Sequence, residues 1–126
     1  MITREEILMG RDEQYPLNDE QEANLAKLLE SLNKFRSIYG KPMFVSSGYR
    51  PANINANVPG AAKKSNHIVC LACDFADKDG SLDQWCSDNL SVLEDCGLWL
   101  ESPTHTPGWC HLQAIAPRSN RRVFIP

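Results

Sequence analysis

The chain has 126 residues, a mass of 14.2 kDa and a formal net charge of −3, which together fit one domain over residues 1–126. With 42% hydrophobic and 23% charged residues, the chain can bury a core and lacks the composition of a disordered protein. The acidic balance argues against a nucleic-acid partner, which would need a basic face. No apolar run reaches the ~20 residues that a membrane span requires.

Two helices are predicted at the start of the chain. A capping-box pattern at Thr3–Glu6 predicts a short helix through about Met9. A second cap at 18–21 opens a longer helix, which Gly40 ends. The apolar residues of this longer helix recur at steps of three and four and form one stripe, made of Leu25, Leu28, Leu29, Leu32, Phe35 and Ile38.

Strands are predicted to dominate the rest of the chain. A strand at 43–45 runs into the segment 46–51, and a loop with a helical turn follows over 51–66. A capping-box pattern at Ser81–Gln84 opens one helix to about Asp95. The further predicted strands are 71–76, 98–100, 109–115 and a short edge strand at 122–125. Helices first and strands later predict the α+β class with a small antiparallel sheet.

Side-chain alternation on two of these strands separates polar from apolar residues. Along a strand successive side chains point to opposite faces, so Asp74 and Cys73 lie on different faces, and so do His111 and Cys110. If the two strands are neighbours, Asp74 and His111 meet on one face while the two cysteines pack behind them.

His67 lies seven residues before Asp74 and supplies a second imidazole. Two imidazoles, one carboxylate and an open fourth position form the ligand set of a catalytic zinc, whereas structural zinc sites are closed and rich in cysteine. The spacing alone is a weak signal. The alternative interpretation is two ordinary histidines and an aspartate at the end of a strand.

Three segments, in order, resemble one family. Residues 65–74, Ser-Asn-His-Ile-Val-Cys-Leu-Ala-Cys-Asp, are similar to the Ser-x-His-x-x-Gly-x-Ala-x-Asp signature of the zinc D-Ala-D-Ala carboxypeptidases. That superfamily includes phage L-alanyl-D-glutamate endolysins and shares its fold with the hedgehog signalling domain. Ser-Gly-Tyr-Arg at 47–50 and Trp-Cys-His at 109–111 resemble two further segments of the family. The resemblance implies a small antiparallel sheet with helices packed on one side.

The resemblance also implies the site residues. It implies His67, Asp74 and His111 as ligands of Zn²⁺. It implies that Arg50 steadies a substrate carbonyl or carboxylate, because guanidinium is always charged and binds pairs of oxygens. The hydroxyl of Ser65 is implied to contact substrate or to orient His67. Trp109 shares the predicted face of His111, where it is either a wall of the substrate cleft or an ordinary core or rim aromatic.

Two positions depart from the family pattern. Relatives often carry a glutamate three residues before the last histidine, where this chain has Gly108. The chemistry needs a carboxylate that takes a proton from water and passes it to the leaving amine, and Glu101 is the best-placed acid upstream. Cys70 stands where the signature has glycine, and its thiol either binds the metal or packs beside the loop.

The resulting expectation is a zinc peptidase that hydrolyses peptidoglycan stem peptides, either as a D-Ala-D-Ala carboxypeptidase or as an L-Ala-D-Glu endopeptidase, encoded by a phage or prophage. We expect a monomer without nucleic-acid or membrane partners. The N-terminus shows no signal peptide, so we expect the protein in the cytoplasm of the producing cell, in a virion, or released to the wall on lysis.

Two alternatives stay open at this point. The chain could be a zinc-stabilised binding or structural module on the same fold that has lost hydrolysis. It could also hold a structural zinc through Cys70 and Cys73, which form a Cys-x-x-Cys pair without a second such pair.

Overall fold

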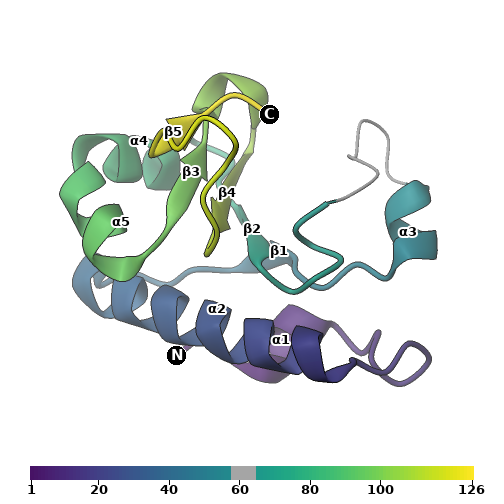
Figure 1. Cartoon of the computed structure of the whole chain (residues 1–126). Helices are drawn as coiled ribbons and strands as arrows, with labels where there is room; N and C mark the ends of the chain where they lie inside the picture. The colour runs from purple at the N-terminus through teal and green to yellow at the C-terminus, as the bar shows by residue number, and fades with distance from the viewer. Residues whose placement is uncertain (58–64) are drawn as a thin grey trace.

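The computed structural model describes residues 1–57 and 65–126, and it shows helices packed against a small sheet (Figure 1). None of the helices in these two ranges is both long enough and apolar enough to cross a membrane. The helical elements are α1 (Arg4–Leu8), α2 (Asp19–Tyr39), α3 (Ala52–Ala56), α4 (Ser81–Asp88), α5 (Leu90–Cys96) and the 3-10 turn η1 (Pro103–His105). The strands are β1 (Val45–Ser47), β2 (Ala72–Ala76), β3 (Trp99–Glu101), β4 (Trp109–Gln113) and β5 (Val123–Phe124).

Both predicted N-terminal caps are confirmed. The Thr3 hydroxyl accepts a hydrogen bond from the backbone N–H of Glu6 at 3.2 Å, and the Glu6 carboxylate accepts one from the backbone N–H of Thr3 at 3.3 Å. Asn18 and Gln21 make the same reciprocal pair at the start of α2. These bonds satisfy amide groups that the first helical turn leaves without partners.

The apolar stripe of α2 is confirmed except at its end. Phe35 and Tyr39 pack against Trp85, with ring centroids 5.5 Å and 5.1 Å from the indole. Because Phe35 and Tyr39 are four residues apart, the packed face follows them, and Ile38 is left 48% exposed. The prediction that Ile38 belongs to the stripe was wrong. The fully buried members are Leu25, Leu28, Leu32 and Phe35.

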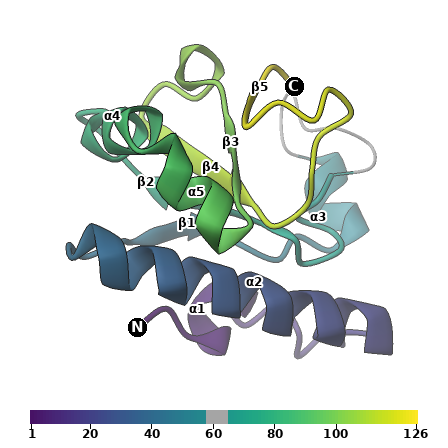
Figure 2. The same cartoon turned by 60° about the vertical axis from the view of Figure 1, so that its left-hand side comes forward.

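The α+β class is confirmed, and the sheet is mixed. Its strand order is β1-β2-β4-β3-β5, with antiparallel pairs between β1 and β2, β2 and β4, and β4 and β3. The last strand, β5, pairs with β3 in parallel. The helices α1 and α2 form a layer on one side of the sheet, α4 and α5 lie beside β3, and α3 stands apart beyond β1 (Figures 1 and 2).

The two faces of β2 and β4 differ as alternation predicts. Asp74 pairs with His111 and Phe75 pairs with Cys110 in the antiparallel register. Phe75, Cys73 and Cys110 are completely buried in the core, so the face that carries Asp74 and His111 is the one left for a site. All five cysteines are buried and free.

The single helix predicted from Ser81 is two helices, and its predicted cap is wrong. The N-cap of α4 is Gly80, without a side-chain cap. The Asp77 carboxylate instead accepts hydrogen bonds from the backbone N–H groups of Leu82 and Asp83, at 2.9 and 2.8 Å. Asn89, at φ −129° and ψ 47°, leaves the helical region and separates α4 from α5.

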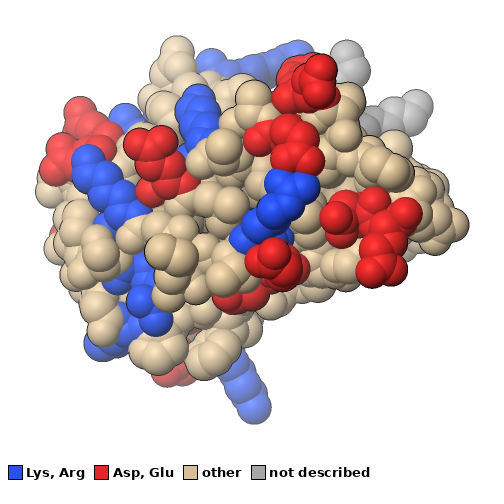
Figure 3. Space-filling model, turned by 90° about the horizontal axis from the view of Figure 1, so that it is seen from below, with Lys and Arg blue, Asp and Glu red and all other residues tan. Residues whose placement is uncertain are grey.

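The bounds of the strands also differ from the prediction by one or two residues. The first strand begins at Val45 rather than 43, and the predicted helical turn in the loop is α3. Residues 58–64 of the predicted loop lie outside the described residues. The outer surface of the α1 and α2 layer carries acidic and basic side chains interspersed (Figure 3). An ion pair joins Arg4 of α1 to Glu22 of α2 at 2.5 Å.

Gly48 is the point where the strand β1 meets α1. A Cβ atom at this position would overlap the carbonyl group of Ile7, and the backbone N–H of Tyr49 donates to the same Ile7 oxygen at 2.8 Å. We expect Gly48→Ala to lower the free energy of unfolding by about 2 kcal/mol or more, because overpacking against backbone cannot relax through a side chain. Urea unfolding measures the change, and the exposed neighbour variant Ser46→Ala should stay within ~0.5 kcal/mol of the unchanged chain. Equal stability of the two variants would contradict the close approach.

Candidate metal centre

Three side chains from separate segments meet above the sheet. His67 comes from the turn before β2, Asp74 from β2 and His111 from β4. Each offers one ligand atom, and these atoms lie within 4.8 Å of one another. Within residues 1–57 and 65–126 no other group of three His, Cys, Asp or Glu side chains is close enough to hold a metal ion.

Asp74 lies between the two imidazoles. Its Oδ1 is 2.8 Å from Nδ1 of His111, and its Oδ2 is 3.3 Å from Nε2 of His67. Both rings are nearly inaccessible to solvent, because the side chain of His111 is 10% exposed and that of His67 is 2% exposed. The carboxylate and the two inward nitrogens therefore form one compact, dry group of ligand atoms.

The outward nitrogen of each imidazole faces an oxygen that can only accept. Nδ1 of His67 lies 2.8 Å from the carbonyl oxygen of Gly48, and Nε2 of His111 lies 2.9 Å from Oε1 of Gln113. Each outward nitrogen must therefore carry a proton and donate it. In a neutral imidazole the inward nitrogen is then a bare lone pair.

This arrangement fits a cation. Two lone pairs and a carboxylate that point at one another repel unless a positive charge lies between them. Histidine ligands in metal sites typically donate their other N–H to a carbonyl or carboxylate oxygen, as His67 and His111 do here. The donor set of two imidazoles and one carboxylate with room for a fourth ligand matches catalytic zinc.

The charges in the group are strongly coupled. Burial alone would raise the pKa of Asp74, but its contacts with His111 and His67 outweigh it and hold the pKa below its ordinary value. Burial lowers the pKa of His67 and prevails over its contact with Asp74. For His111 the bond to Asp74 prevails over burial and the pKa is raised. Without a metal, the ionised Asp74 therefore favours the protonated form of His111.

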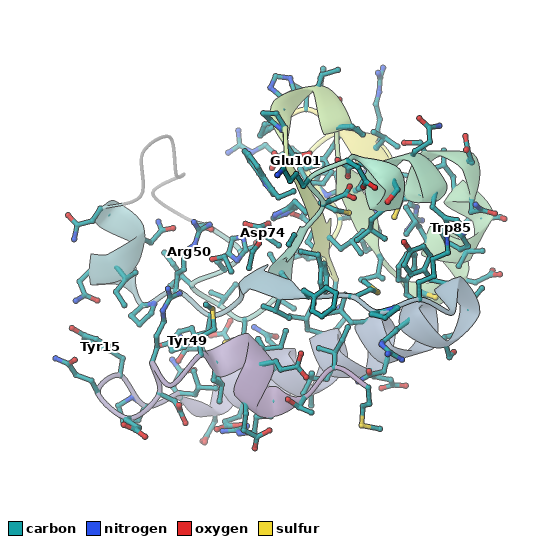
Figure 4. All side chains as sticks on the ribbon, turned by 180° about the vertical axis from the view of Figure 1, so that it is seen from behind. Tyr15, Tyr49, Arg50, Asp74, Trp85 and Glu101 are labelled. Atoms are coloured by element: carbon teal, nitrogen blue, oxygen red, sulfur yellow. The ribbon has the colours of Figure 1, made fainter. Side chains whose placement is uncertain are left out.

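Arg50 and Ser65 lie together next to this group. The Ser65 hydroxyl oxygen accepts a hydrogen bond from the backbone N–H of His67 at 3.2 Å and one from Nη2 of Arg50 at 3.5 Å. Ser65 thus contacts the histidine segment, as one of its two predicted roles requires. Figure 4 shows Arg50 on the same side of the sheet as Asp74, and the charge of Asp74 acts on the guanidinium.

Arg50 carries a donor that no described residue uses. Its Nε is buried and has no hydrogen-bond partner within the described part of the chain. Burial lowers the pKa of the guanidinium, while the charge of Asp74 raises it. A partly buried cation with a spare donor beside a metal centre suits an oxygen of a bound ligand.

Glu101 is on the same face, one strand further along. Because Trp99 pairs with Gln113 and Leu100 with Leu112, the next step of the register brings Glu101 beside His111, on the same face. Figure 4 shows Glu101 above Asp74. Burial raises the pKa of Glu101, His111 lowers it and Asp74 raises it again, with a net rise. A carboxyl with a raised pKa beside a metal centre suits a general base.

The structure explains why position 108 does not supply that glutamate. Gly108 has φ +88°, a backbone conformation that residues other than glycine rarely adopt. Its carbonyl oxygen accepts a hydrogen bond from the backbone N–H of Asp77 at 3.0 Å, which fixes the turn into β4. Trp109 follows, half-buried and paired with Ala76 at the end of the strand, two residues from His111 and so on its face.

The two cysteines of the Cys-x-x-Cys pair are not part of the metal group. Cys70 and Cys73 are both fully buried within the hydrophobic core. Burial raises the pKa of the Cys70 thiol to about 12, which opposes the thiolate form that binds metal. Cys70 also takes φ +63°, so it occupies the left-handed conformation for which the signature glycine is suited. Packing is thus the correct interpretation of both residues.

Sequence reasoning missed the contribution of Gln113. Alternation placed Gln113 on the face of His111, but a strand pattern does not show which atom of the amide lies against the ring. Asn66, which donates to Oε1 of Gln113 at 3.4 Å, carried no sequence signal except its place next to His67.

Comparison with known proteins identifies the family. A scan of protein families matches residues 2–93 to peptidase M15. That segment contains Arg50, Ser65, His67 and Asp74 but ends before Glu101 and His111. No significant match to a curated protein or to a solved structure was found. Because the match covers well over half of the sequence, the chain belongs to the peptidase M15 family.

Proposed function

We propose that this chain is a zinc peptidase that hydrolyses the stem peptides of bacterial peptidoglycan. One observation carries the proposal. Three ligands converge within 4.8 Å, and the outer partners of both imidazoles turn their lone pairs toward the carboxylate. Family membership supports a metallopeptidase, and the residues fit the metal that such chemistry uses.

Each of the site residues has a separate role in the proposed reaction. Zinc held by His67, Asp74 and His111 would polarise a water molecule and a substrate carbonyl. Glu101 takes a proton from the attacking water as its oxygen bonds to the carbonyl carbon, and then delivers that proton to the nitrogen of the leaving amine as the C–N bond breaks. Arg50 binds the substrate carbonyl or carboxylate and offsets the negative charge that develops.

The substrate is proposed at the level of the peptide stem. Both the D-Ala-D-Ala and the L-Ala-D-Glu bond present a carboxylate near a peptide carbonyl, and either suits a guanidinium beside a metal. We also propose a phage or prophage origin and monomeric action. These finer assignments rest on the sequence resemblance.

Incubation with defined muropeptides tests the proposal. Purified protein loaded with zinc is mixed with stem peptides that end in D-Ala-D-Ala and with stems that contain L-Ala-D-Glu, and mass spectrometry identifies the products. We expect one bond to be cut, and cleavage to stop on removal of the metal with a chelator. Zinc-dependent melting without cleavage of any muropeptide would instead identify a zinc-stabilised binding or structural module.

Arg50→Lys tests the role of the guanidinium. Lysine keeps the charge but loses the planar fork and the spare Nε donor. We expect kcat/KM to fall about 10- to 100-fold, the equivalent of the ~1.5–3 kcal/mol of a charge-assisted hydrogen bond, while zinc affinity stays unchanged. Arg121→Lys, at an exposed position, is the matched control. An unchanged kcat/KM in Arg50→Lys would assign Arg50 a purely structural contact with Ser65.

A further inference from the structure

We propose that Gln113 is a positioning residue of the metal centre, which keeps the proton of His111 on Nε2 so that Nδ1 faces the metal. The inference rests on the proposed function, because it concerns the affinity of the same site for zinc. The two imidazoles differ in the kind of group that orients them. His67 is oriented by a backbone carbonyl, that of Gly48, whereas His111 is oriented by a side chain.

Every contact of the Gln113 side chain fixes the direction of its amide. Nε2 donates to the carbonyl oxygen of Ile115 at 2.9 Å. Oε1 accepts from Nε2 of His111 at 2.9 Å and from Nδ2 of Asn66 at 3.4 Å. A flipped amide would place its oxygen against the Ile115 carbonyl and its NH₂ against the NH₂ of Asn66. The amide therefore has one satisfied orientation.

That orientation decides which nitrogen of His111 can bind a metal. Because Oε1 accepts the Nε2 proton, a neutral His111 has its lone pair on Nδ1, the atom 2.8 Å from Asp74. Gln113 is 3% exposed and His111 is 8% exposed, so water has little access to replace the acceptor. Without this acceptor, a neutral His111 is more stable with its proton on Nδ1, because that N–H can donate a hydrogen bond to Asp74. The proton then occupies the position through which Nδ1 would bind the metal.

Asn66 extends the same chain of contacts toward the other ligand. It is the residue before His67, and its side chain reaches across to Gln113 on β4. Asn66 therefore helps to hold Oε1 toward His111 and connects the two histidine segments. Within the described part of the chain its side chain bonds only to Gln113, so we expect its side chain to influence the metal through Gln113.

Zinc affinity of four chains tests the proposal: the unchanged chain, Gln113→Met, Gln113→Glu and the control Gln84→Met. Affinity is measured by competition with a chromophoric chelator, and the melting temperature of the metal-free protein reports folding. Methionine keeps the volume of Gln113 and removes the acceptor, so we expect about 10- to 100-fold weaker zinc binding, as for other outer partners of metal ligands. Glutamate keeps an acceptor oxygen for Nε2 of His111 but loses the donor to the Ile115 carbonyl, so it should bind zinc more weakly than the unchanged chain and more tightly than Gln113→Met. Gln84 is exposed and, among the described residues, its side chain bonds only to Asp88, so Gln84→Met should leave the zinc affinity unchanged.

A double-mutant cycle with Asn66→Ala separates this role from a general loosening of the fold. Asn66→Ala should weaken zinc binding in the unchanged chain and have no further effect in Gln113→Met, because its path to the metal is gone. Equal zinc affinity of folded Gln113→Met and the unchanged chain would overturn the inference and leave the proposed function intact, and so would equally weak binding by Gln113→Met and Gln113→Glu. Absence of zinc binding by the unchanged chain would overturn the proposed function and this inference together.

Discussion

Asp74→Asn is expected to weaken zinc binding at least about 100-fold and to abolish peptide cleavage. Asp74 is the only charged ligand of the proposed set, and it lies within 3.3 Å of both imidazoles. If the ~10–16 kcal/mol that binds a structural zinc is divided among its ligands, the loss of one costs several kcal/mol. Chelator competition measures the affinity, and cleavage of the stem peptide measures the activity.

The matched control is Asp95→Asn, which makes the same chemical change at an exposed residue of α5 and should alter neither quantity. Cys70→Ser and Cys73→Ser complete the set, because a cysteine-ligated zinc would be released by these changes and retained in Asp74→Asn. Retention of zinc and cleavage by Asp74→Asn would show that the metal centre lies elsewhere.

Glu101→Gln is expected to lower kcat about 10²- to 10⁴-fold, the contribution typical of a positioned general base. Glutamine keeps the shape and the hydrogen-bonding capacity of the side chain but cannot take a proton. Glu101 lies beside His111 without belonging to the group of three ligands, so zinc affinity and KM should stay close to those of the unchanged chain.

Glu94→Gln, at an exposed position of α5, controls for the loss of one negative charge. Single-turnover cleavage measures the chemical step directly. A parallel loss of zinc affinity in Glu101→Gln would make Glu101 a ligand, and a kcat equal to that of the unchanged chain would place the base elsewhere.

Several features of the fold and site could be predicted because they depend on near neighbours in sequence. The caps at Thr3 and Asn18 require only residues three positions apart, and both are present. Alternation likewise assigned Asp74 and Cys73 to opposite faces, and the core face is confirmed by complete burial of Cys73. The Ser81 cap failed because a residue further back, Asp77, took the amide groups at the start of α4.

By itself the sequence determined the starts of α1 and α2, the strand face on which Asp74 and His111 lie, and the residue types from which a zinc site can be made. Only the tertiary structure decided that Asp74 pairs with His111, that Glu101 lies beside them, and that the amide of Gln113 faces the imidazole. The physical reason is that periodicity fixes the direction of a side chain relative to its own strand. Which strands become neighbours, and in which register, depends instead on packing between segments that are far apart in the chain.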